Sequence, residues 1–130
     1  MSRAKVVTDQ EGRFYGIRFT CPGCASDQAH GNFGGYNCLP VHWTPPGMER
    51  SPNIAGLDLW TFNGDFDRPT FSPSILTQST WSDGSKFCCH SFVTDGRIQF
   101  LGDCTHVLAG QTVDLPEIPP TAEPTDGGAP

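Results

Sequence analysis

The chain has 130 residues, of which 36% are hydrophobic, and this supports one modest core but not two. Its formal net charge is -6 and its eight Lys and Arg residues form no cluster, which excludes nucleic acid as an expected partner. The first residues contain no apolar signal-peptide core and no apolar run approaches the roughly 20 residues that cross a bilayer, so we expect a cytoplasmic protein without a membrane partner.

Glycine and proline are abundant, with 15 and 12 residues, and this favours short strands joined by many turns. Alternation of apolar and polar residues predicts strands over residues 3–8, 13–20, 38–43, 57–62, 69–77 and 112–115. We therefore predict a mainly β fold, with a small α+β arrangement as the alternative, in one compact domain of short antiparallel strands over residues 1–115. Residues 116–130 are rich in Pro and Glu and predict a disordered acidic tail. The oligomeric state is left open.

The stretch Lys86–Leu108 contains the strongest local signal in the chain. Two runs rich in aromatic and β-branched residues flank Asp95-Gly96. An Asp-Gly pair between such runs predicts a β-hairpin with a type I′ turn. After the second strand we expect a single helical turn at residues 105–109, with Gly110 as its end.

Side chains alternate along strands, so this register predicts two faces for the hairpin. The expected core face carries Phe87, Cys89, Ser91, Val93, Ile98, Phe100, Gly102 and Cys104. The other face carries Cys88, His90, Phe92, Gln99, Leu101 and Asp103. Cys89 is then diagonal to Cys104, and His90 is diagonal to Asp103, with α-carbons roughly 7–8 Å apart. One hairpin is thus expected to serve two sites.

Cys21 and Cys24 are separated by Pro-Gly and directly follow a predicted strand. This spacing forms a tight knuckle in which both sulfurs can face one ion, as in zinc ribbons. Cysteines in a reducing compartment are more often thiols or metal ligands than disulfides, and the βαβ context of a redox motif is missing. The motif therefore predicts a structural zinc ion, which would supply folding free energy. We assign Cys38 and Cys88 to packing or to the surface.

The remaining zinc ligands are expected near the end of the hairpin. Cys104 can join Cys89 on the core face, or it can join His106 if the strand continues without interruption. The alternative for Cys89 is that it packs as a small apolar side chain. The candidate metal ligands are therefore Cys21, Cys24, Cys89, Cys104 and His106.

A second set of residues has the chemistry of a nucleophilic site. An extended backbone places Thr70, Ser72 and Ser74 on one side of their strand. A serine becomes a nucleophile when a histidine accepts its proton and a third group orients that histidine, and His90 with Asp103 could supply both parts. The alternative is that the serines cap turns, that His90 is a surface residue and that Asp103 binds a nearby backbone N–H.

Three stretches carry a resemblance to a known family: CPGC, LWTFNGDFDRPTFSPSIL and CHSFVTDGRIQFLGDCTHVLAGQTVDLP. Over Phe14–Pro116 the chain resembles small phage and bacterial proteins often labelled ammonia monooxygenase, and larger members resemble the BubE peptidases of bacterial ubiquitin-like operons. The BubE resemblance implies a deubiquitinase-like serine peptidase whose nucleophile is Ser72 or Ser74. His90 would be the base, and Asp103 would orient it. We expect the monooxygenase label to be wrong, because the sequence has no membrane-spanning helix and no obvious copper or di-iron ligand set.

Two functions are consistent with these features. The first is a zinc-binding phage or prophage accessory protein that acts in the host cytoplasm and cleaves a peptide or isopeptide bond through an acyl-enzyme, with backbone N–H groups near residues 72–75 as the oxyanion site. The second is a non-catalytic zinc module that binds a host protein, for example to inhibit a defence pathway. The expected partner is a protein or peptide substrate in the first case and a host protein in the second.

Overall fold

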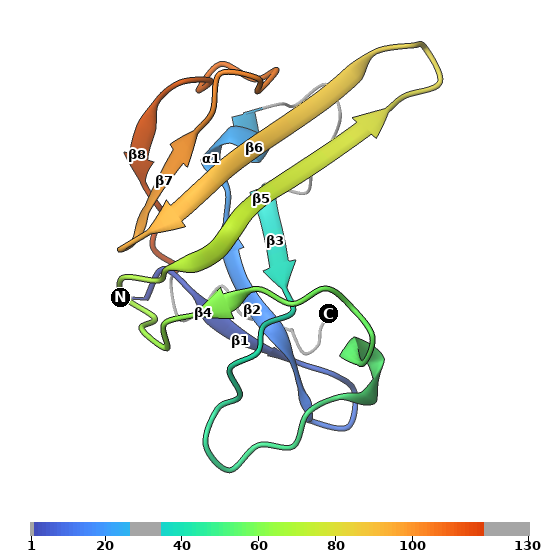
Figure 1. Cartoon of the computed structure of the whole chain (residues 1–130), viewed down its shortest axis with the longest axis vertical. Helices are drawn as coiled ribbons and strands as arrows, with labels where there is room; N and C mark the ends of the chain where they lie inside the picture. The colour runs from blue at the N-terminus through green and yellow to red at the C-terminus, as the bar shows by residue number, and fades with distance from the viewer. Residues whose placement is uncertain (1, 27–34, 119–130) are drawn as a thin grey trace.

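The computed structural model describes residues 2–26 and 35–118. Its strands are β1 (Lys5–Thr8), β2 (Phe14–Thr20), β3 (Tyr36–Leu39), β4 (Thr61–Phe62), β5 (Phe71–Thr80), β6 (Lys86–Thr94), β7 (Arg97–Phe100) and β8 (Thr112–Asp114). A one-turn helix, α1 (Pro22–Ser26), follows β2, and a 3-10 helix (Pro52–Ile54) precedes β4. The mainly β fold and the single compact domain predicted from the sequence are confirmed (Figure 1).

The strands form two antiparallel sheets. The first has the order β1-β2-β3, and its first two strands pair across a turn in which the Asp9 carboxylate accepts the backbone N–H groups of Glu11 and Arg13. The second sheet has the order β4-β5-β6-β7-β8. Its longest members, β5 and β6, form a hairpin whose tip projects away from the other described strands (Figure 1).

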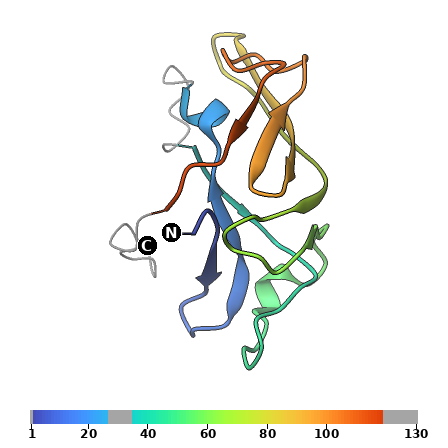
Figure 2. The same cartoon turned by 90° about the vertical axis from the view of Figure 1, so that its left-hand side faces the viewer.

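The hydrophobic core lies between the two sheets, which Figure 2 shows side by side. It is built from side chains that point inward from both sheets, and its largest fully buried members include Phe14, Ile17, Phe19, Phe87, Val93, Ile98 and Phe100. Each such side chain contributes about 1.5–3 kcal/mol of transfer free energy when it is fully buried. The packing between the sheets therefore fixes which face of β6 points inward.

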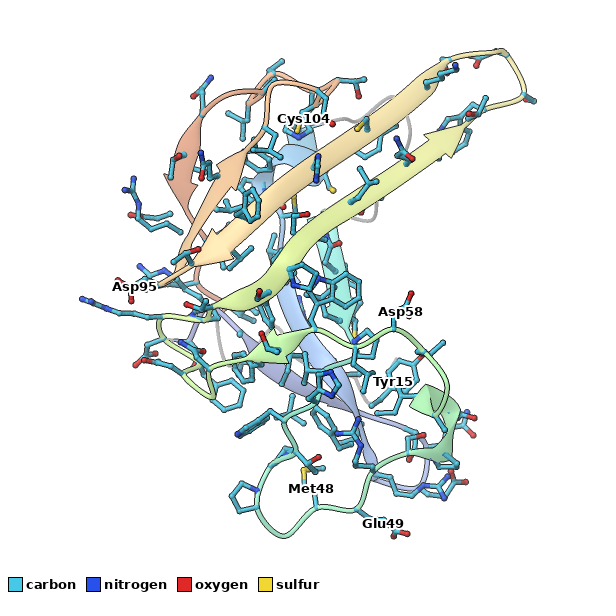
Figure 3. All side chains as sticks on the ribbon, viewed as in Figure 1. Tyr15, Met48, Glu49, Asp58, Asp95 and Cys104 are labelled. Atoms are coloured by element: carbon cyan, nitrogen blue, oxygen red, sulfur yellow. The ribbon has the colours of Figure 1, made fainter. Side chains whose placement is uncertain are left out.

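The β6–β7 hairpin has the predicted register near its turn. Thr94 lies opposite Arg97, and Asp95 and Gly96 have φ angles of 53° and 79°. Two consecutive positive φ angles identify the type I′ turn that the Asp-Gly pair predicted. Figure 3 labels Asp95 at this turn and Cys104 in the segment that follows β7.

Two predicted strands are shorter than expected, and the residues missing from them meet in an isolated bridge between Val41 and Trp60. The strand expected over residues 38–43 ends at Leu39, and the one expected over 57–62 consists of Thr61–Phe62 alone. The Trp60 N–H donates to the Pro40 carbonyl and its carbonyl accepts the His42 N–H, so its backbone pairs with the segment after β3. The chain therefore passes from one sheet to the other at Trp60.

The segment after β7 also differs from the expectation. Instead of the helical turn expected over residues 105–109, residues 107–110 form a hydrogen-bonded turn in which the Ala109 N–H donates to the His106 carbonyl. Farther on, Ile118 is buried and forms a bridge with Ser2. The rest of the predicted tail, residues 119–130, lies outside the described residues. Among the helices that the structure describes, none is long and apolar enough to cross a membrane.

We expect Gly96→Ala to lower the free energy of unfolding by about 1–2 kcal/mol, because an L side chain is strained at positive φ. A Cβ there would also lie 3.2 Å from the Arg68 Cα. Gly84→Ala is the matched control, since Gly84 has a φ of 88° and no atom within 4 Å of the added Cβ. Urea unfolding should show a larger loss for Gly96→Ala, and equal losses would contradict a tightly constrained turn.

Candidate active site and metal centre on one hairpin

Alternation along β6 separates two groups of functional side chains. Phe87, Cys89, Ser91 and Val93 are buried, whereas Cys88 and His90 are partly exposed and Phe92 is exposed. Because consecutive side chains point to opposite faces, Cys89 faces the core and its neighbour His90 faces outward. The two sites predicted from the sequence thus begin at adjacent residues of one strand.

On the outer face, His90 lies between a serine and a carboxylate. Its Nδ1 is 3.1 Å from Asp103 Oδ2, and its Nε2 is 3.2 Å from Ser74 Oγ. The side chain of His90 is 25% exposed and that of Asp103 is 56% exposed. The contact predicted between His90 and Asp103 is formed, but the predicted register ends with β7 at Phe100. Gly102 is exposed and Asp103 lies in a turn, and Thr105 bonds the Cys88 carbonyl in the place predicted for Asp103.

Ser74 reaches His90 because the β5–β6 register shifts between Phe71 and Ile75. The Ser74 carbonyl accepts a hydrogen bond from Trp60 Nε1 at 3.3 Å, which ties this part of β5 to the segment entering β4. Ser72 instead lies opposite Thr61 of β4 and is exposed. The structure therefore brings together three of the four candidate catalytic residues, Ser74, His90 and Asp103.

This arrangement has the geometry needed to activate a hydroxyl. When the neutral imidazole carries its proton on Nδ1, it donates to Asp103 and leaves Nε2 free to accept the Ser74 hydroxyl. Both heavy-atom distances lie at or near the limit for a nucleophile–base–orienter chain. A serine in this setting can attack an electrophilic carbon.

On the inner face, thiols gather around Cys89. Its sulfur is 3.6 Å from Cys21 Sγ and 3.4 Å from His106 Nε2. The sulfurs of Cys21, Cys24 and Cys89 lie within 4.8 Å of one another, and all three residues are buried. In a tetrahedral site with Zn–S bonds of about 2.3 Å, two sulfurs are roughly 3.8 Å apart. The three cysteines can therefore hold a metal ion.

The charges of these thiols depend on one another. Hydrogen bonds with Cys21 and Cys89 lower the pKa of Cys24 to about 3, whereas the hydrogen bond with Cys24 raises the pKa of Cys21 to about 12. The pKa of Cys89 is also raised by its hydrogen bonds with Cys21 and Cys24. The hydrogen bonds among the three buried sulfurs thus favour one thiolate over two or three, and further ionisation needs a cation nearby.

His106 packs closely on the Cys-x-x-Cys knuckle. Its ring is buried, makes an edge contact with Phe100 at 4.7 Å between centroids, and lies where a side chain on Gly23 would be. The Leu108 N–H points at His106 Nδ1 at 3.2 Å, which favours the tautomer that carries its proton on Nε2 and donates to Cys89. If His106 bound a metal ion through Nε2, its proton would have to move to Nδ1. The backbone N–H of Leu108 would then have to turn away from Nδ1.

Cys104 is less central than the sequence reasoning expected. Its sulfur lies within 4.8 Å of the ligand atoms of Cys89 and His106. Cys89 also belongs to the group formed with Cys21 and Cys24, whereas Cys104 does not. The Cys104 sulfur accepts the His90 N–H at 3.2 Å and donates to the His90 carbonyl at 3.3 Å. Cys104 therefore contacts the backbone of His90, whose side chain contacts Ser74 and Asp103.

Cys38, assigned to packing or the surface, is half-buried, and burial raises its thiol pKa to about 12.

Sequence reasoning missed several residues that build these sites. The predicted strand over residues 57–62 assigns Trp60 to neither site, and no motif points to Asn37, whose side-chain amide lies 4.0 Å from Cys24 Sγ. Gly23 was read only as part of the knuckle, although the ring of His106 requires a residue without a side chain there. The only sequence signal for this close packing is that Gly23 lies between the two cysteines of the knuckle.

Comparison with protein families gives one result that bears on these sites. The family model described as "Bacterial ubiquitination-like system serine protease (BubE)" matches residues 1–101 of the chain. The matched range contains Ser74 and His90 and ends two residues before Asp103. No curated protein and no solved structure matches the chain.

We expect Gly23→Ala to destabilise the protein by about 1–3 kcal/mol, because the added Cβ meets Phe100 and the ring of His106 in a packed interior. Gly102→Ala is the control, since its Cβ would meet no atom within 4 Å. Thermal melts and the rate of thiol alkylation report the two effects. A Gly23→Ala protein with wild-type stability and thiol reactivity would contradict the close packing of His106 on the knuckle.

Proposed function

The chain belongs to the BubE family of bacterial ubiquitination-like system serine proteases, and on this premise we propose that it hydrolyses a peptide or isopeptide bond with Ser74 as the nucleophile. The observation that carries the proposal is the contact chain Ser74 Oγ to His90 to Asp103. Ser72 is the less favoured nucleophile, because it lies on the part of β5 that pairs with β4. The expected substrate is a protein of a ubiquitin-like system.

In this mechanism His90 Nε2 accepts the hydroxyl proton while Ser74 Oγ attacks the carbonyl carbon of the scissile bond. Backbone N–H groups near residues 72–75 would stabilise the oxyanion. His90 then gives the proton to the leaving amine, and the C–N bond breaks to leave an acyl-enzyme. A water molecule, deprotonated by His90, releases the carboxylic acid and restores Ser74. Asp103 accepts the hydrogen bond from His90 Nδ1 and so holds the imidazole in the reactive tautomer.

We further infer that the inner thiol cluster binds one zinc ion through Cys21, Cys24 and Cys89. Their spacing and the thiolate among them support a soft divalent cation with tetrahedral coordination. His106 and Cys104 are the two candidates for the fourth ligand, and each lies within 4.8 Å of Cys89. The ion would be structural, because four protein ligands leave no open position for substrate. We propose that the protein acts in the cytoplasm. If a phage carries the gene, this is the cytoplasm of the host cell.

We expect Ser74→Ala and His90→Ala each to lower kcat/KM by about 10⁴-fold or more, with nearly unchanged melting temperature, because both residues lie on the outer face of the sheet. Asp103→Asn should lower it by about 10²–10⁴-fold, and its exposure favours the smaller loss. Ser72→Ala is the matched control and should retain activity. The assay is cleavage of a bacterial ubiquitin-like protein fused to a reporter.

A non-catalytic role predicts the opposite pattern in the same assay. Zinc-loaded wild-type protein would cleave no such fusion, and His90→Ala would behave like wild type. That pair of results would contradict the hydrolase and favour a module that binds a host protein.

We expect about one zinc ion per purified chain by elemental analysis. Cys21→Ser and Cys89→Ser should lose the ion and melt at a lower temperature, since loss of a ligand forfeits much of the binding free energy in a domain stable by roughly 5–15 kcal/mol. Cys38→Ser is the control and should keep both. His106→Gln compared with Cys104→Ser identifies the fourth ligand by the larger loss of zinc. A folded, metal-free protein with six reactive thiols would contradict the site.

A further inference from the structure

The outer edge of β5 is open beside Ser74. β4 pairs only with the first two residues of β5, Phe71 and Ser72, whereas β5 continues to Thr80. In the described part of the chain, no strand pairs with Ile75–Thr80 on the side away from β6. Figure 1 shows this length of β5 running beyond β4 along the border of the sheet.

The register determines which backbone groups face this edge. Leu76 lies opposite His90, and Gln78 lies opposite Cys88. The backbone N–H and C=O groups of His90 and Cys88 bond on the side away from β5, to Leu101, Cys104 and Thr105. In an antiparallel pair, opposed residues either bond each other or both direct their groups away. Leu76 and Gln78 therefore direct their N–H and C=O groups to the open edge.

This edge begins at the proposed nucleophile. The Ser74 carbonyl faces the same side, since it accepts the indole N–H of Trp60 from the segment entering β4. Leu76 is two residues along the strand, so its side chain shares the face of Ser74. Leu76 is 51% exposed, and Phe92, on the same face of β6 as His90, is 42% exposed. Two apolar side chains thus flank the contact between Ser74 and His90.

Pro73 and the register shift both lie before Ile75, and beyond that residue the edge lacks the features by which proteins block strand addition. Leu76–Thr80 contains no charged residue and no proline, and its pairing with β6 is regular. Open edges with free backbone groups favour pairing with another chain, and most are blunted by Lys, Pro or a bulge. An unblunted edge that leads to a serine fits an extended peptide.

We propose that an extended segment of the protein substrate binds as an added strand along Leu76–Thr80. Its backbone pairs with Leu76 and Gln78, and its apolar side chains on the Ser74 face contact Leu76 and Phe92. Backbone pairing of this kind gives affinity, and alternate side chains give specificity. The inference rests on the proposed function, and it names the substrate as a segment that is unfolded or extended near the scissile bond, with apolar residues.

The first test compares Leu76→Pro with Leu76→Ala. Both remove the leucine side chain, but only proline removes the outward N–H, a change that edge strands tolerate. Leu76→Pro should lower kcat/KM for the ubiquitin-like fusion about two- to tenfold more than Leu76→Ala, the effect of one lost hydrogen bond. For p-nitrophenyl acetate, which has no peptide backbone to pair, the two variants should have equal kcat/KM once the Ser74→Ala background is subtracted. Equal kcat/KM for the fusion in the two variants would overturn the inference.

The second test modifies the substrate, so it does not depend on the folding of a proline variant. A fluorogenic peptide with the sequence around the scissile bond is N-methylated at one residue at a time. Strand addition predicts that kcat/KM falls at every second position, because alternate N–H groups of the peptide face β5. A uniform loss, or no loss, at successive positions would overturn the proposal.

Further outcomes separate this inference from the proposed function. Wild-type protein that cleaves neither the fusion nor the ester would contradict both. Cleavage of the fusion without alternation in the peptide series would leave the serine hydrolase intact and remove the added strand. If the edge binds a second copy instead, sedimentation will show a wild-type dimer that Leu76→Pro dissociates with unchanged turnover, which also overturns the proposal.

Discussion

The register of the β6–β7 hairpin is the constraint on which both candidate sites depend. The type I′ turn at Asp95-Gly96 fixes which residues of β6 and β7 oppose each other. Because side chains alternate, a slip of one residue would move Cys89 outward and His90 into the core. The buried aromatic residues of β6 and β7 oppose such a slip, since it would expose them. Core packing and turn geometry thus define the two faces together.

Adjacent residues of this hairpin hold groups of opposite chemistry. Cys89 lies in the thiol cluster, and the next residue, His90, lies in the polar site. Likewise, Asp103 lies in the polar site, and the next residue, Cys104, lies near the thiol of Cys89. The two sites also touch, because the Cys104 sulfur contacts both the N–H and the carbonyl of His90. The buried sulfurs are held by the hairpin on one side and by α1 on the other. The packing of the buried sulfurs therefore stabilises the backbone of His90, whose side chain forms the polar site on the outer face.

Much of this was accessible from the sequence, because its strongest signals are local. The Asp-Gly turn and the alternation along β6 predicted the hairpin, its faces and the proximity of His90 to Asp103. Long-range geometry was not accessible. The shift in register that brings Ser74 rather than Ser72 to His90 depends on how β4 and Trp60 meet β5. Likewise, Cys89 rather than Cys104 is the shared thiol, because the end of β2 places Cys21 beside it.

The central claim is that Ser74 is an activated nucleophile paired with His90. The most direct measurement is to treat the folded protein with a fluorophosphonate and to locate the adduct by peptide mass spectrometry. The account predicts one phosphonylated residue, Ser74, and loss of that adduct in the His90→Ala protein. An unmodified Ser74, an adduct on Ser72, or equal modification in the His90→Ala protein would contradict it.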